Sequence, residues 1–311
     1  MSNSESERRI VSGMRPTEKL NLGHLQGVLK SWVQLQHEND CFFFVADLHA
    51  LTTNHENSKN IEQYSFETVV GWLAAGVNPG SCTIFLQSKV PEHTELYLLL
   101  SMITPLSWLE RVPSYKNQQA KLNDKELGTY GLLGYSLLQA ADILIYKAGK
   151  VPVGTDQVAH VELTREIARR FNHIYGREEG FEEQAEAAIK LMGKKSAKLY
   201  RDLRRSFLEK ADSEALLKAR ALLEEQQNLS IGDQERLYGY LEGGGRIILP
   251  EPEPVLVEPN KVDPGEMVER SKQFEEDPDL VKSVIQEGSR KARLIARETL
   301  EEVKEAMGIG H

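Results

Sequence analysis

The stretch from Val11 to Gly27 carries residues whose types and spacing suit the binding of phosphate groups. A short apolar segment leads through a turn containing Gly and Pro, and Gly23 stands at the second position of a predicted helix. The first N–H groups of a helix lack partners and lie at the positive end of its dipole, so a polyphosphate can bind there. Asn21 and His24 add side-chain donors. A loop-to-helix junction capped by the asparagine explains the same pattern.

A second group of polar residues lies on one side of a helix predicted near residues 134–146. Tyr135, Gln139 and Asp142 are spaced so that their side chains share one helix face. The acid stands among Leu, Ala and Ile, where burial is costly unless a hydrogen-bond donor meets it. An indole N–H would supply that donor. A helix cap or an ion pair is the structural alternative.

His49 closely follows a continuous apolar run at 41–46, which has the length and composition of a strand buried on both faces. In an open parallel sheet, polar residues just beyond the carboxyl end of a strand face the ligand crevice. His49 is therefore a candidate substrate contact. A purely structural histidine is the alternative.

A Val-Pro-Val-Gly run and the Asp-Gln pair after it suit a flat ring with a charged or hydroxylated part. Val151 and Val153 offer apolar walls, and Gly154 permits close approach. Asp156 and Gln157 can hold an ammonium group or a ribose hydroxyl. A strand end that leads into a helix carrying an ion pair is the alternative.

Alternating strands and helices must position these residues. The hydrophobic pattern predicts strands at 10–12, 41–46 and 82–86, and helices at 22–36, 61–75 and 92–102. The helix at 92–102 is apolar nearly all round, which predicts that it lies in the core. Strands and helices alternating with short links are typical of a doubly wound parallel sheet.

The pattern also predicts how the chain is divided. We expect a lead-in at 1–9, an α/β domain at 10–165, a helical region at 166–245, a return to the α/β domain at 246–262 and a helical C-terminal domain at 263–311. In the last part, one helix is predicted to start at Asp277-Pro278 and a final amphipathic helix to span Ser289–Met307.

Composition narrows the class of protein. The chain has 311 residues, 40% hydrophobic and 27% charged, which is ordinary for a soluble globular protein. The two cysteines, Cys41 and Cys82, provide neither a disulfide framework nor a four-cysteine metal site, and no protein metal site is predicted. No stretch approaches the roughly 20 apolar residues of a membrane helix, and the N-terminus is not signal-like. We therefore expect a cytoplasmic protein without a membrane partner.

The net charge of −9 argues against nonspecific coating of nucleic acid, but it permits a local basic face. Such a face could form on one predicted helix from Lys194, Lys195, Lys198, Arg201, Arg204 and Arg205. A solvated helix surface is the alternative.

Residues 12–24 resemble the ATP signature of class I aminoacyl-tRNA synthetases, most closely the tryptophanyl-tRNA synthetases. The resemblance rests on Ser12-Gly-Met-Arg-Pro-Thr and Asn21-Leu-Gly-His24, with Asn21 in place of the first histidine of the signature. It implies ATP, with Mg²⁺, and an in-line displacement at the α-phosphate that forms an aminoacyl adenylate. It implies catalytic roles for Asn21, His24 and Arg15, and ATP contacts from Ser12, Gly13, Met14, Arg15, Gly23, His24 and Asp156.

Other segments similar to the same family include 87–93, 103–116, 134–146 and 151–160. They imply a Rossmann-like fold and a tryptophan pocket in which Asp142 accepts a hydrogen bond from the indole nitrogen. The implied amino-acid contacts are Val11, His49, Tyr135, Gln139, Asp142, Val151, Val153, Gly154 and Gln157. Ser136 and Gln139 depart from the residues common in the family, and a tyrosine-specific enzyme is a minor alternative.

The family's signature lysine loop and the cysteine-containing part of its anticodon module are missing where residue 262 meets 263. A shortened paralogue, an engineered chain or a sequence joined across a missing segment would each explain this. The resemblance implies a tryptophan–tRNA ligase that acts on tRNA(Trp) as a symmetric dimer, with 92–110 as a possible interface. A catalytically weak tryptophan-binding paralogue is the alternative, because the lost lysines would stabilise transition-state charge.

Overall fold

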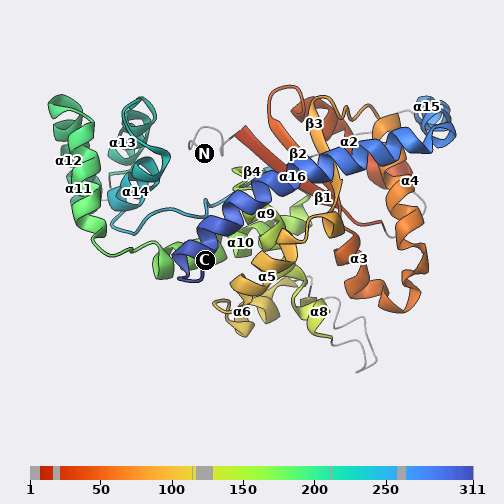
Figure 1. The fold of residues 1–311 in the computed structure, drawn as a ribbon, viewed down its shortest axis with the longest axis horizontal. Helices are drawn as coiled ribbons and strands as arrows, with labels where there is room; N and C mark the ends of the chain where they lie inside the picture. Colours follow the sequence, from red (N-terminus) through yellow and green to blue (C-terminus); the bar gives the residue numbers. More distant parts are fainter. Residues whose placement is uncertain are drawn as a thin grey trace. The chain divides into compact units, whose positions relative to one another are not determined.

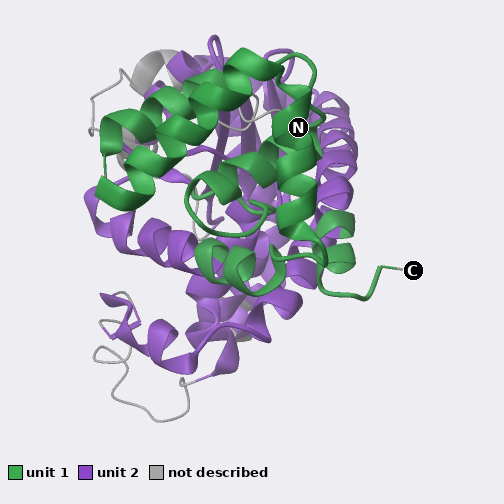
Figure 2. Cartoon of the chain, turned by 90° about the vertical axis from the view of Figure 1, so that its left-hand side faces the viewer, with its two compact units in different colours: residues 1–7, 168–251, 301–311 green, residues 8–167, 252–300 purple. Residues whose placement is uncertain are grey.

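The computed structural model describes residues 8–16, 22–113, 115–116, 129–210, 212–257 and 264–310, with the backbone alone at 22–27, 54, 56–57 and 264–268. The described chain divides into two compact units (Figure 2). We call residues 8–167 and 252–300 the sheet unit, and residues 168–251 and 301–310 the helical unit. The domain boundaries predicted above remain a prediction.

Five parallel strands form the centre of the sheet unit, in the order β3-β2-β1-β4-β5 (Figure 1). They are β1 (Arg9–Met14), β2 (Asp40–Val45), β3 (Cys82–Leu86), β4 (Lys150–Val153) and β5 (Glu253–Leu256). The first three strands extend the sheet in one direction, and β4 then pairs with β1 on the other side. The predicted doubly wound parallel sheet is confirmed, and its strand order reverses between β1 and β4.

Helices and short turns connect and extend these strands. Those that begin in the sheet unit are α2 (Leu22–Leu35), α3 (Asp47–Asn54), η1 (His55–Asn60), α4 (Ile61–Ala74), η2 (Gln87–Lys89), α5 (Glu92–Ser101), α6 (Leu106–Arg111), α8 (Tyr130–Leu133), α9 (Tyr135–Leu144), η4 (Thr155–Gln157), α10 (Val158–Tyr175), α15 (Pro264–Glu276) and α16 (Pro278–Ala306). The helical unit holds α11 (Phe181–Leu191), α12 (Lys194–Lys210), α13 (Ser213–Glu224) and α14 (Ile231–Leu241).

The side chains of β2 alternate between two buried faces of the sheet. On one face, Phe43 stacks on Trp32 of α2 with ring centroids 4.2 Å apart. On the other face, Phe42 stacks on Tyr146, just beyond α9, at 4.9 Å. The continuous apolar run of β2 therefore reflects burial on both sides, as the sequence predicted.

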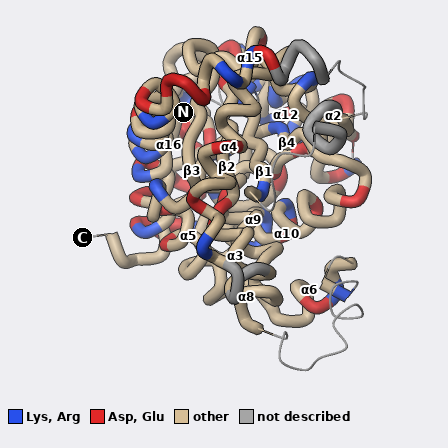
Figure 3. The backbone as a smooth tube through the Cα atoms, turned by 90° about the vertical axis from the view of Figure 1, so that its right-hand side faces the viewer, with Lys and Arg blue, Asp and Glu red and all other residues tan. Residues whose placement is uncertain are grey.

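Helix α16 corrects the prediction of two separate C-terminal helices, because it runs unbroken from Pro278 to Ala306. Its Gly288 lies inside the helix, where the sequence suggested an interruption. A Cβ atom built there would stand 1.8 Å from the carbonyl oxygen of Ile84 in β3. The glycine therefore permits close helix–strand packing and does not end the helix. Basic and acidic residues alternate along α16 (Figure 3).

Helix α5 shows that the expectation of a wholly buried segment at 92–102 was wrong. Leu96 and Leu100 are buried, but Leu98 and Met102 are 54% and 67% exposed. One side of the helix packs on α9, whereas Leu98 and Met102 meet solvent.

In the helical unit, buried residues of α11 to α14 form a separate core that includes Ile189, Tyr200 and Leu237. The predicted basic helix is α12, and part of its charge is already paired. Arg201 contacts Glu186 at 2.6 Å, and the Arg204 guanidinium lies 3.8 Å from the centre of the Tyr240 ring. Lys194, Lys195, Lys198 and Arg205 are exposed.

Among the described residues, no helix is both long and apolar enough to cross a membrane. Within the same ranges, no group of three or more His, Cys, Asp or Glu residues could hold a metal ion.

The close packing at Gly288 makes a prediction about stability. Gly288→Ala should lower the free energy of unfolding by about 1 to 3 kcal/mol, because the added methyl group meets backbone that cannot move aside. The midpoint of thermal unfolding measures the effect. Gly232→Ala is the matched control, since it lies in α14 with nothing within 4 Å of the added atom. Equal effects of the two substitutions would contradict this account of α16.

Candidate active site

A cavity of about 350 Å³ lies in the sheet unit where β1 and β4 end. This is the point at which the strand order reverses, and ligands of open α/β sheets bind at such points. Of the predicted site residues, the cavity is lined by Val11, Ser12, Gly13, Met14, Arg15, His49, Tyr135, Gln139, Asp142, Val151, Val153, Gly154 and Gln157. The topology thus brings together residues from four separate parts of the sequence.

Four predicted residues are not placed at the cavity by the described coordinates. Asn21 lies outside the described residues, and only the backbone of Gly23 and His24 is described, in α2, which begins at Leu22. Asp156 is exposed on η4 and does not line the cavity. Its carboxylate accepts a hydrogen bond from the Gln157 side chain at 2.9 Å.

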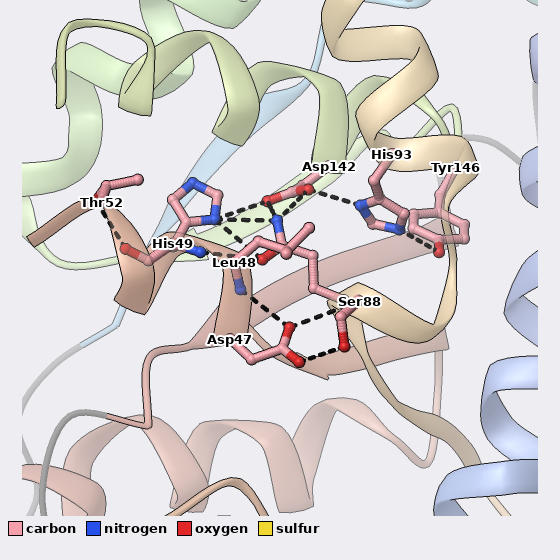
Figure 4. Close-up of polar contacts among 9 residues, drawn as sticks. Asp47, Leu48, His49, Thr52, Ser88, His93, Asp142 and Tyr146 are labelled. Carbon is pink, nitrogen blue, oxygen red and sulfur yellow. Dashed lines mark hydrogen bonds and ion pairs between the residues drawn. The ribbon is translucent and has the colours of Figure 1, made fainter. Parts of the chain in front are cut away.

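The buried carboxylate of Asp142 is the most heavily hydrogen-bonded group at the cavity, and its residue is only 1% exposed. Gln87 Nε2 donates to its Oδ1 at 2.7 Å and its Oδ2 at 2.9 Å, and His93 Nδ1 lies 2.6 Å from Oδ1 (Figure 4). His93 therefore provides a hydrogen-bonding partner within ion-pair distance of Asp142, and Asp142 also lines the cavity. The same carboxylate is therefore hydrogen-bonded within the protein and borders the cavity.

The hydrogen-bonded cluster continues behind Asp142. His93 Nε2 lies 2.7 Å from the hydroxyl of Tyr146, and neither His93 nor Tyr146 is exposed. Burial, then the nearby charges of Asp142 and Glu92, raise the pKa of Tyr146 well above its ordinary value, whereas Arg9 opposes them. The phenol is therefore protonated at neutral pH and can donate a hydrogen bond.

His49 lies beside this cluster on α3, directly after β2. Its Nδ1 lies 3.0 Å from Gln87 Nε2 and 3.4 Å from Asp142 Oδ2. Burial lowers its pKa, although Asp142, Gln87 and the Tyr135 backbone act in the opposite direction. The imidazole is therefore neutral at pH 7, and its ring stands edge-on to Tyr135 at 4.6 Å.

Asp47 links the segment after β2 to the segment after β3, close to His49. Asp47 Oδ1 accepts hydrogen bonds from the backbone N–H groups of Leu48 and Ser88, each at 3.0 Å, and the Ser88 hydroxyl contacts the other carboxylate oxygen (Figure 4). This acid fixes η2 against the start of α3. Gln87 and His49 are consequently held next to each other.

At the other end of the cavity, Arg15 follows β1 and is exposed. Its guanidinium carbon lies 5.8 Å from the centre of the Tyr135 ring, within the range of a cation–π contact. Gly13 has no room for a side chain, because an added Cβ would lie 2.4 Å from the Phe44 ring. The glycine lets this ring form part of the cavity wall.

The sequence interpretation missed Gln87 and His93 as parts of the site. It noted segment 87–93 only for its family resemblance. A usable signal was present, because Gln87 directly follows the buried strand β3, as His49 closely follows β2. His93 gave no such signal, since its place opposite Asp142 depends on the packing of α5 against α9.

Comparisons with known proteins agree with this fold and with the family resemblance of the sequence. The sequence model of the family described as tRNA synthetases class I (W and Y) matches residues 3–198. The chain is 62% identical over 257 residues to a tryptophan–tRNA ligase of Ralstonia nicotianae, covering 83% of this chain and 64% of that protein. It is 42% identical to the enzyme of Thermotoga maritima, covering 97% of this chain and 99% of that protein.

Solved structures support the same fold. Campylobacter jejuni tryptophanyl-tRNA synthetase complexed with ADP and tryptophan superimposes with a TM-score of 0.64 at 24% identity, covering 96% of this chain and 99% of that one. The enzyme of Mycoplasma pneumoniae gives 0.64 at 22% identity, covering 97% and 98%. The chain therefore belongs to the tryptophan–tRNA ligases, a family of class I aminoacyl-tRNA synthetases.

Proposed function

We propose that this chain activates tryptophan with ATP and transfers it to tRNA(Trp). The observation that carries the proposal is the buried carboxylate of Asp142, which lines a cavity at the strand-order reversal of the sheet. A buried acceptor of this kind suits a flat apolar ring that carries one N–H group. Val151 and Val153 supply apolar surface for that ring.

In the first step, a carboxylate oxygen of tryptophan attacks the α-phosphorus of ATP and pyrophosphate leaves. In the second, the 3′-terminal hydroxyl of the tRNA attacks the carbonyl carbon of the adenylate and AMP leaves. Neither step needs a covalent bond to the protein, so the chain contributes placement and charge stabilisation. Mg²⁺ would neutralise phosphate charge, and it usually keeps phosphate and water ligands.

The residues around β1 suit the nucleotide. We assign Ser12, Gly13, Met14 and Arg15 to ATP, because they line the cavity at the end of a central strand. Arg15 is exposed and carries a permanent positive charge that can meet a phosphate group. Asn21, Gly23, His24 and Asp156 remain proposed nucleotide contacts on the family resemblance alone.

The polar residues of α9 suit the amino acid. Asp142 would accept from the ring N–H, and Tyr135 and Gln157 would contact the ammonium group. Gln139 lines the same cavity, and its Oε1 is buried without a hydrogen-bond partner among the described residues. A polar substrate group that donates to this oxygen would remove the cost of leaving it unpaired.

For the tRNA, we propose phosphate contacts from the exposed basic residues Lys194, Lys195, Lys198 and Arg205 of α12. Arg201, which pairs with Glu186, and Arg204, which lies over the Tyr240 ring, would hold α12 against its neighbouring helices. We place the enzyme in the cytoplasm, as expected for translation.

We also propose that the enzyme is a homodimer. Leu98 of α5, Met102 just after it and Leu106 of α6 expose 54%, 67% and 60% of their surfaces. Exposed apolar patches of this kind often mark contacts between proteins. A second copy of the chain would cover these residues by two-fold symmetry.

The decisive test is tryptophan-dependent exchange of pyrophosphate into ATP by the 311-residue chain with Mg²⁺. We expect exchange with tryptophan and at least ten-fold less with tyrosine at equal concentration. Binding of tryptophan without exchange, measured by calorimetry, would contradict the ligase and favour a binding-only protein. The test also shows whether the chain works without the family's lysine loop, whose place lies outside the described residues.

Asp142→Asn should lower kcat/KM for tryptophan in this exchange by about 10- to 100-fold. A hydrogen bond to a charged group contributes roughly 1.5 to 3 kcal/mol, and the amide is a weaker acceptor. Asp279→Asn is the control, because it makes the same chemical change at a carboxylate that is 91% exposed. An unchanged kcat/KM in Asp142→Asn would remove this residue from the tryptophan pocket.

The mass of the native protein in solution tests the dimer. Light scattering of the unaltered chain should give twice the mass of 35.1 kDa. The double variant Leu98→Ser/Met102→Ser should shift this mass toward that of a monomer. Leu217→Ser, at a 66% exposed leucine in α13, is the control and should leave the mass unchanged. A monomeric unaltered chain at micromolar concentration would rule out the proposed dimer.

A further inference from the structure

Three side chains connected to Asp142 lie entirely behind the cavity wall. Gln87, His93 and Tyr146 are each 0% exposed, and none of them lines the cavity. They come from η2, α5 and the residues just after α9. Because they cannot touch a molecule in the cavity, any effect they have on a substrate must act through a residue of the cavity wall. Asp142 contacts Gln87 and His93, and Gln87 also contacts His49.

The direction of the hydrogen bonds follows from the distances. His93 Nδ1 lies 2.6 Å from Asp142 Oδ1, where two lone pairs would repel each other, so Nδ1 carries hydrogen and donates. The Tyr146 hydroxyl lies 2.7 Å from Nε2 and can donate to it, which leaves the ring hydrogen on Nδ1. The tyrosine thus selects the histidine tautomer that donates to the carboxylate.

The orientation of Gln87 is fixed in a similar way. Its Oε1 accepts from the backbone N–H of His49 at 3.3 Å, so its Nε2 points to Asp142. The second hydrogen of Nε2 can be donated to Nδ1 of neutral His49, 3.0 Å away. His49 therefore does not donate from Nδ1 to the carboxylate, although Asp142 Oδ2 is 3.4 Å away.

The hydrogen bonds among the described residues leave one acceptor position of the Asp142 carboxylate unused. A carboxylate offers about four acceptor positions, two on each oxygen. Oδ1 accepts from both Gln87 and His93, whereas Oδ2 accepts from Gln87 only. Within the described part of the chain, Oδ2 therefore keeps one acceptor position. This position can accept a hydrogen bond from a ring N–H.

We propose that Gln87, His93 and Tyr146 are positioning residues, which turn the Asp142 carboxylate so that its remaining acceptor position meets the ring N–H of tryptophan. This inference rests on the proposed function. The three residues set the preference of the pocket for a ring with a donor at this position over a ring of equal shape without one. They leave the apolar contacts with the ring unaffected.

The test compares tryptophan with β-(3-benzothienyl)alanine, in which sulfur replaces the ring N–H at nearly the same shape. Calorimetry gives the dissociation constant of each, and their ratio measures the use of the N–H group. Both ligands bind the same folded fraction in a given preparation, so partial unfolding of a variant cancels in the ratio. A merely structural role would therefore leave the ratio unchanged.

Tyr146→Phe removes only the hydroxyl and should reduce this ratio by about three- to ten-fold, mainly through weaker tryptophan binding. His93→Leu, which removes the donor to Asp142, should reduce it further. His93→Asn should restore part of the ratio, because the asparagine amide can donate from nearly the position of Nδ1. Tyr200→Phe is the matched control, since its hydroxyl donates to the carbonyl of Leu237 at 2.6 Å in the helical unit.

The outcomes separate the inference from the proposed function. If the unaltered chain prefers tryptophan and the Tyr146 and His93 variants keep the same ratio, the positioning role is wrong and the proposed function stands. If the unaltered chain binds neither ligand, both are wrong. A reduced ratio in Tyr200→Phe of equal size would also overturn the positioning role, because it would reflect a general loss of packing.

Discussion

The placement of a buried negative charge at Asp142 constrains much of the sheet unit. A carboxylate removed from water costs several kcal/mol unless donors satisfy it, and here the donors come from outside its own helix. Gln87 follows β3, and His93 lies in the first turn of α5. Helix α9 therefore cannot shift relative to the sheet edge without breaking these contacts. The same requirement orients the carboxylate toward the cavity.

The parallel sheet explains why residues far apart in sequence share one cavity. All five strands point the same way, so their carboxyl ends lie along one edge. The order reverses between β1 and β4, which leaves a crevice between the connections that leave in opposite directions. Val11 and Val153 line it from these neighbouring strands. Because Gly13 has no side chain, the Phe44 ring can form part of the crevice wall.

Helix α16 and helix α5 show how packing decides details that local patterns leave open. Gly288 in α16 lies against the backbone of Ile84, so a residue that normally weakens a helix is accommodated within one. Glu92 at the start of α5 is shared by Arg293 and Arg297 of α16. Burial raises the pKa of this acid, but the hydrogen bonds from Arg293 and Arg297 outweigh it and keep the pKa below its ordinary value. The ion-paired cluster thus joins the two helices within the sheet unit.

The sequence by itself determined the parallel α/β class and most residues at the cavity, because hydrophobic period and strand-end position are local properties of the chain. Thirteen predicted residues line the cavity; strand-end position indicated His49, whereas Ser12 and Met14 came from the family resemblance. It could not reveal that His93 and Tyr146 stand behind Asp142, or that Leu98 and Met102 are exposed. Those facts depend on which face of α5 meets α9. Only the tertiary structure decides that, because hydrogen bonds between distant side chains and the partner of each helix face arise from packing and leave no periodic signal in the sequence.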